Sequence, residues 1–183
     1  IASTSAPSHT IFGYHPYWMG SDWQNYTYNL LTTIAWFSAE ATPSGGLGNI
    51  HGWSVTGLIN LANANGVDVV LGVTMSSSSD LTTLLSSSTN RQNLISNLIA
   101  QVKAGNADGV NVDFEGLPST QRNNMVRFIT DLTTACHQQI PGSQVTLATP
   151  AVDWSNAWDY NALANVSDGL FIMGYAYHWS GSS

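Results

Sequence analysis

Cysteine, charge and long apolar runs are all scarce in this sequence. Its one cysteine, Cys136, excludes an internal disulfide, and its helical setting predicts a buried thiol. No apolar run reaches the roughly 18 residues of a membrane-spanning helix, so membrane insertion is not expected. Only 8% of residues are charged, and eleven acidic residues outnumber four scattered basic ones: Arg91, Lys103, Arg122 and Arg127. This balance argues against nucleic acid or an anionic membrane as a partner.

Two kinds of motif are missing as well. No GxGxxG or GxxxxGK[ST] pattern follows the first predicted strand, which argues against a nucleotide-binding sheet. The histidines His15, His51 and His178 never approach the spacing of metal ligands. We therefore expect neither a metal site nor a cofactor.

Short apolar runs and helical patterns alternate regularly along the chain. Six runs rich in β-branched or aromatic residues predict buried parallel strands over residues 10–18, 32–40, 67–75, 107–116, 143–151 and 169–178. Apolar residues recur at the helical period over residues 54–65, 90–104 and 119–138. Gly66 would end the first helix, and Thr89 or Asn90 would cap the second. Repeated strand, helix and strand predict right-handed crossovers in a parallel sheet.

An open doubly wound sheet and a closed barrel both satisfy this alternation. Polar and aromatic residues crowd the ends of most of the strands, where a barrel builds its active site. We predict one domain over residues 1–183 with an α/β fold of the (β/α)8 TIM-barrel type. Such a barrel usually needs eight units and about 250 residues. With six strands, either the chain stops short of its last two units or the sheet is an incomplete barrel with exposed edges.

The fourth predicted strand carries a row of polar side chains. Because side chains alternate between the two faces, Asn111, Asp113 and Glu115 would point into the barrel while the apolar residues between them point outward. Burying such a row costs free energy, and two carboxylates only about 6–7 Å apart along a strand repel each other. A strand end bonded to neighbouring loops would be the structural explanation, but the cost favours a functional site.

Residues 108–115 (DGVNVDFE) resemble the DxxDxDxE signature of glycoside hydrolase family 18, the chitinases and related N-acetylglucosaminidases. Residues 12–18 (FGYHPYW) are similar to the first strand of that family, and residues 173–179 (MGYAYHW) to its sixth-strand MxYDxH pattern. The subgroup that the chain most resembles also includes spore-cortex and peptidoglycan hydrolases.

The resemblance implies a catalytic role for three residues. Glu115 would protonate the glycosidic oxygen, Asp113 would hold the 2-acetamido group of the sugar, and Tyr175 would donate its hydroxyl to the acetamido carbonyl. The acetamido oxygen would attack the anomeric carbon, so that configuration is retained through an oxazolinium intermediate. Asp108 and Gly109 would be structural.

Further residues are expected to contact the substrate. Tyr14, Asn111 and Met173 belong to the three matching segments, and Trp154 and Trp179 follow the fifth and sixth strands, where their faces could stack on pyranose rings.

Two positions depart from the family pattern. Asn111 stands where the family has its middle aspartate and cannot accept a proton from a neighbouring carboxyl group. Ala176 stands where an aspartate is expected after the tyrosine, which predicts reduced or altered activity.

Three functions remain open on this reading. The first is a retaining hydrolase that cleaves β-1,4 bonds in chitin or chitooligosaccharides by substrate-assisted catalysis. The second is a peptidoglycan-lytic N-acetylglucosaminidase, and the third is a chitinase-like protein that binds glycans without cleaving them. The partner in each case is a polysaccharide. A surface with little charge and much Ser, Thr and Asn, together with Ile1 in place of an initiator Met, predicts a secreted protein.

Overall fold

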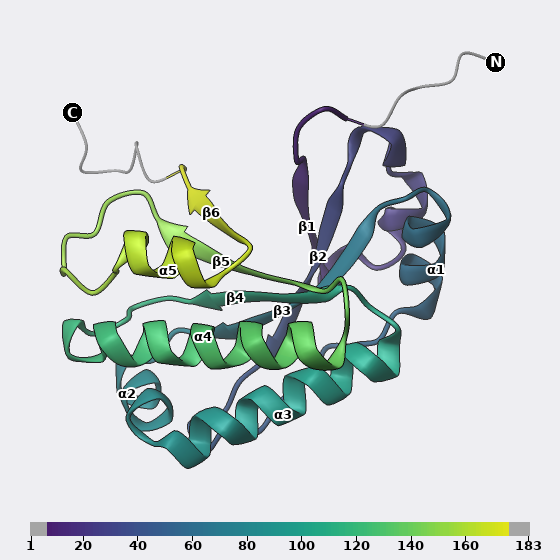
Figure 1. Cartoon of the computed structure of the whole chain (residues 1–183). Coiled ribbons are helices and arrows are strands. Elements are labelled where there is room, and N and C mark those ends of the chain that lie inside the picture. Colours follow the sequence, from purple (N-terminus) through teal and green to yellow (C-terminus); the bar gives the residue numbers. More distant parts are fainter. Residues whose placement is uncertain (1–6, 176–183) are drawn as a thin grey trace.

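The computed structural model describes residues 7–175, and its centre is one sheet of six parallel strands (Figure 1). Each strand pairs with the next one along the chain. The strands are β1 (Phe12–Pro16), β2 (Thr33–Glu40), β3 (Asp68–Met75), β4 (Gly109–Phe114), β5 (Gln144–Pro150) and β6 (Gly169–Met173). All six strands predicted from the apolar runs are present, with shorter bounds.

The sheet curls so far that side chains of its first and last strands meet across the concave face. The rings of Tyr14 on β1 and Phe171 on β6 contact edge to face, with centroids 5.1 Å apart. Phe12 lies 5.7 Å from the same phenylalanine ring. The fold is therefore a (β/α)8-type barrel of which the described residues form six units, which confirms the predicted fold class. Within residues 7–175, β1 and β6 are the edge strands.

The helices pack on the convex face of the sheet (Figure 1). They are α1 (Thr56–Ala64), α2 (Ser78–Ser86), α3 (Ser88–Gly105), α4 (Arg122–Gln139) and α5 (Tyr160–Val166). Four short 3-10 turns lie in the loops: η1 (Tyr17–Met19), η2 (Asp22–Asn25), η3 (Tyr28–Leu30) and η4 (Ser119–Gln121). On the outward side of β4, Phe114 stacks on Phe128 of α4 with ring centroids 5.7 Å apart, and both are buried. Because side chains alternate along a strand, Asn111 and Asp113 face the opposite way, toward the barrel interior.

An Asp-Gly pair begins both β4 and β6. The amide of Asp108 donates to the carbonyl of Val69 at 2.7 Å, and its carboxylate accepts from the amide of Val69, also at 2.7 Å. Asp168 makes the same two bonds with Val145 of β5, at 2.8 and 2.6 Å. Gly109 has a φ of 151°, and a Cβ there would lie 1.9 Å from the carbonyl oxygen of Gln144. Asp108 and Gly109 thus lie at the base of β4, far along the strand from its polar end.

The structure differs from the sequence prediction in its helices. Helices α2 and α5 were not expected, and α3 begins earlier than predicted because Ser87 caps it, accepting from the amide of Asn90 at 3.2 Å, in place of Thr89 or Asn90. The strand predicted over residues 169–178 ends at Met173 in the described part of the chain.

The single cysteine and the helices have the following properties in the structure. Cys136 lies fully buried in α4, and burial raises the pKa of its thiol to about 11. None of the described helices combines the length and hydropathy needed to cross a bilayer.

Candidate active site

The polar row of β4 faces the barrel interior in layers. Asn111 is fully buried, and both ends of its amide are occupied: the Tyr14 hydroxyl donates to Oδ1 at 3.0 Å, and Nδ2 donates to the Thr146 hydroxyl at 2.8 Å. Asp113 comes next along the strand and Glu115 follows the last residue of β4. Along the inner face of β4, the polar side chains therefore run from the buried, hydrogen-bonded Asn111 to the exposed Glu115 at the rim of the barrel.

Asp113 is the unusual member of this row. Its side chain is 6% exposed, yet Oδ1 has no hydrogen-bond partner among the described residues. Burial, reinforced by the negative charge of Glu115, raises the pKa of Asp113 to about 6. A buried acceptor without a partner costs free energy. Within residues 7–175, the arrangement therefore leaves this carboxyl oxygen able to accept a hydrogen bond from a ligand in the cavity.

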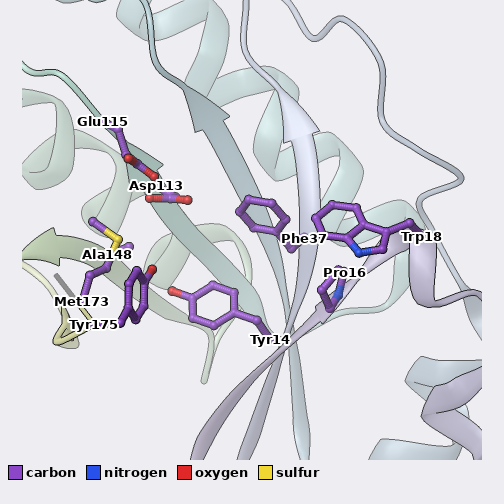
Figure 2. Close-up of a pocket in the computed structure, with 9 residues that line it drawn as sticks. All are labelled: Tyr14, Pro16, Trp18, Phe37, Asp113, Glu115, Ala148, Met173 and Tyr175. Atoms are coloured by element: carbon purple, nitrogen blue, oxygen red, sulfur yellow. The ribbon is translucent and has the colours of Figure 1, made fainter. Parts of the chain in front are cut away.

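A cavity of about 330 Å³ opens above Asp113 at the carboxyl ends of the strands (Figure 2). Figure 2 shows the two carboxylates on one side and the rings of Phe37 and Trp18 on the other. The wall consists of residues from β1, β2, β4, β5, β6 and the loops that follow them: Tyr14, Pro16, Trp18, Phe37, Asp113, Glu115, Ala148, Met173 and Tyr175. Its volume is at the lower end of the range for small-molecule sites, about 300–1,000 Å³.

Two tyrosine hydroxyls point into this cavity on the side of Asp113 (Figure 2). Burial and the nearby charge of Asp113 raise the pKa of Tyr14 far above its usual value. Burial, with smaller contributions from Asp113 and Glu115, also raises the pKa of Tyr175. Both phenols keep their protons at neutral pH and can act as hydrogen-bond donors. Tyr14 is already engaged with Asn111, whereas the Tyr175 side chain is 78% exposed.

The aromatic side of the cavity comes from the first two strands. Phe37 reaches it where the register between β2 and β3 shifts, between Trp36 and Ala39. Trp18, in the η1 turn after β1, contacts Phe37 edge to face at 6.0 Å and remains 63% exposed. Phe37 was not predicted as a site residue, although its alternation with Thr33 and Ala35 places it on the inner face.

Several predicted substrate contacts lie elsewhere. Asn111 lies beneath the cavity and does not line it, because its side chain is fully buried between Tyr14 and Thr146, to which it is hydrogen-bonded. Trp154, in the loop after β5, is 92% exposed and does not line this cavity either. Trp179 and Ala176 lie outside the described residues. Tyr14, Asp113, Glu115, Met173 and Tyr175 do come together at the cavity.

Not every loop tryptophan is available to a ligand. Trp53 and Trp158 are buried at 6% and 5% exposure, and the Trp53 indole donates to the carbonyl of Gln101 at 3.2 Å. Residues 7–175 contain no cluster of three His, Cys, Asp or Glu side chains that could hold a metal ion.

A parallel α/β barrel with a carboxylate pair, tyrosine hydroxyls and an aromatic wall at one cavity has the arrangement of a glycosidase. The model of the family Glycosyl hydrolases family 18 matches residues 10–183, and the chain belongs to that family.

Individual relatives agree with this assignment. The chain is 31% identical over 104 residues to YdhD of Bacillus subtilis, assigned as a sporulation-specific glycosylase, over 54% of this chain and 24% of YdhD. It is 26% identical over 162 residues to Di-N-acetylchitobiase of Rattus norvegicus, over 84% of this chain and 38% of that protein. A chitinase structure from Bacteroides thetaiotaomicron has the same fold, with a TM-score of 0.79 at 21% identity over 91% of this chain and 54% of that one. The chain thus spans well under half the length of either curated relative.

Proposed function

We propose that this chain supplies the catalytic carboxylates of a retaining glycoside hydrolase that cleaves β-1,4 bonds next to N-acetylglucosamine in chitin or chitooligosaccharides. The observation that carries the proposal is the buried, unpartnered Oδ1 of Asp113 beside the exposed Glu115 at the cavity. An acetamido N–H is a donor of the kind that this oxygen lacks.

Each step of the reaction has a candidate group on the chain. Glu115 protonates the glycosidic oxygen as the bond to the anomeric carbon breaks, and the acetamido oxygen attacks that carbon from the opposite face. Asp113 accepts the acetamido N–H as positive charge develops on the oxazolinium ring, and the Tyr175 hydroxyl donates to the acetamido oxygen. Water then opens the ring, with Glu115 now accepting a proton, so the product keeps its configuration.

The aromatic wall supports a sugar substrate. Trp18 and Phe37 present ring surface opposite the two carboxylates, where the apolar face of a pyranose can pack. The cavity is therefore polar where bonds change and apolar where the substrate only needs to be held.

A second candidate is the same chemistry on peptidoglycan. The similarity to YdhD, assigned as a sporulation-specific glycosylase, favours it. The two candidates differ only in whether the sugars beside the cleaved bond carry lactyl-peptide groups, so one product analysis separates them.

Replacing Glu115 with Gln tests the proposal. The change keeps the shape of the side chain and removes its proton, so we expect hydrolysis of a chitotriose-based chromogenic substrate to fall by about 100- to 10,000-fold while binding stays nearly intact. Asp131→Asn is the control, because Asp131 lies on α4 and lines neither this cavity nor its neighbour.

Product analysis completes the test. Proton NMR during early hydrolysis should show the β anomer, and early α product would refute the acetamido mechanism. Mass spectrometry of digests of chitin oligomers and of peptidoglycan, side by side, identifies the substrate. If the unmutated chain and a longer form both bind these glycans without cleaving them, the non-catalytic glycan-binding function replaces the proposal.

A further inference from the structure

A second cavity, of about 280 Å³, adjoins the first on the side of β2 and β3. The two cavities share Trp18, Phe37, Asp113 and Glu115. The remaining wall of the second is more polar and comes from the ends of β2 and β3 and from two loops: Tyr17, Ser38, Glu40, His51, Thr74, Met75 and Ser76. A glycan held at Asp113 and Glu115 could therefore extend into it.

His51, in the wall of this cavity, is held by its backbone and by its side chain. It has a positive φ of 48°, a conformation that costs a residue other than glycine about 1–2 kcal/mol. Its amide donates to Oδ1 of Asn49 at 2.8 Å, its ring stacks on Tyr17 with centroids 3.8 Å apart, and its Nε2 lies 2.9 Å from Oε1 of Glu40. The strained turn thus fixes a histidine against both an aromatic ring and a carboxylate.

The charge in this cavity is negative. Three carboxylates line it, on Glu40, Asp113 and Glu115, and His51 is the one basic residue in its wall. The Glu40 side chain is 56% exposed, so its second carboxylate oxygen can accept a hydrogen bond from a ligand. Asp113, which is more than nine-tenths buried and has an unpartnered Oδ1, lines this cavity too. A cationic group is therefore favoured here and an anionic one is opposed.

We propose that this second cavity binds a sugar unit with a free 2-amino group, a glucosamine, beside the N-acetylglucosamine at the cleavage site. That position along the glycan rests on the proposed function, whereas recognition of the amine does not. The protonated amine donates to Glu40 while the sugar ring lies against the Tyr17 and Trp18 side of the cavity. An N-acetylated unit has a neutral amide and does not gain this charge pairing.

Binding of two tetrasaccharides tests the inference without requiring cleavage. Isothermal titration at about pH 6, below the pKa of a typical amine, compares glucosamine tetramer with its fully N-acetylated counterpart on the whole chain carrying Glu115→Gln, so that neither ligand is cleaved during the titration. We expect Glu40→Gln to weaken binding of the glucosamine tetramer by about two- to fivefold, the ratio for one partly exposed ion pair, and to leave the acetylated tetramer unchanged. Asp131→Asn removes one negative charge on α4 and should change neither affinity.

Salt provides a measurement that needs no variant. Raising the ionic strength from about 50 to 500 mM should weaken glucosamine binding selectively, because screening acts on the charged ligand. The inference is overturned if the glucosamine tetramer does not bind, if Glu40→Gln leaves its affinity unchanged, or if Asp131→Asn weakens it equally. Loss of cleavage in all assays with intact, Glu40-dependent binding would instead overturn the proposed hydrolase and leave the amine site standing.

Discussion

Replacing Asp113 with Asn should change how the stability of the fold depends on pH. Asp113 has a pKa of about 6 in the folded chain against an ordinary value of 3.8, so the folded state holds its proton more tightly than the unfolded state. The stabilising effect of that proton is complete below the ordinary value and is lost as pH rises through the folded value. A shift of about two units corresponds to about 3 kcal/mol, and because the cavity admits water we expect about 2 kcal/mol.

Urea denaturation at pH 4 and pH 8 measures this quantity. Between these pH values, the free energy of unfolding of the unmutated chain should fall by about 2 kcal/mol more than that of Asp113→Asn, equivalent to about 4–8 °C in Tm for a domain of this size. Any loss from placing an uncharged amide at this position is common to both pH values and cancels. Asp131→Asn should follow the unmutated chain. Equal pH dependence in the two chains, within about 0.5 kcal/mol, would refute the raised pKa of the buried Asp113 carboxyl group.

Three further variants test the packing and hydrogen bonds around the site. Tyr14→Phe removes the donor to the buried Oδ1 of Asn111, so the free energy of unfolding in urea should fall by about 1–3 kcal/mol, and no change would contradict the hydrogen bond. Gly109→Ala places a Cβ 1.9 Å from a carbonyl oxygen and should cost more than about 4 kcal/mol, whereas Gly66→Ala, with a φ of 71° and no atom within 4 Å, should cost about 1–2 kcal/mol. Similar losses in thermal unfolding for both glycine variants would show that close packing at β4 is not the cause.

The strands and the polar row were predictable because their signals are local. Alternation on β4 is a property of consecutive residues, and it placed Asn111, Asp113 and Glu115 on one face. Helix α2 was not predicted because serines and threonines surround Leu81, Leu84 and Leu85, and such a composition is typical of loops. The helix can be predicted only if Ser77 is recognised as its N-terminal cap.

The loop residues of the site could not be predicted in this way, because their positions depend on turns that have no periodic sequence pattern. Trp18 reaches the cavity through a 3-10 turn, and His51 reaches the neighbouring cavity through a left-handed residue. Asn111, expected to contact substrate because it belongs to a matching segment, does not line the cavity and is hydrogen-bonded to Tyr14 and Thr146. Strand alternation gives the face on which a side chain lies and not its depth along the barrel axis. The substrate contact of Asn111 stays a prediction.

The hydrogen-bonded amide of Asn111 also limits the routes by which Asp113 can gain or lose a proton. Its oxygen accepts from Tyr14 and its nitrogen donates one hydrogen to Thr146, and because a neutral amide does not titrate, Asn111 can neither deliver a proton to Asp113 nor remove one. Exchange at Asp113 must then pass through the open side of the barrel, by way of solvent, a bound sugar or Glu115. A glycan in the cavity would displace water from that carboxyl group, so Glu115 and the sugar itself would become its nearest proton partners.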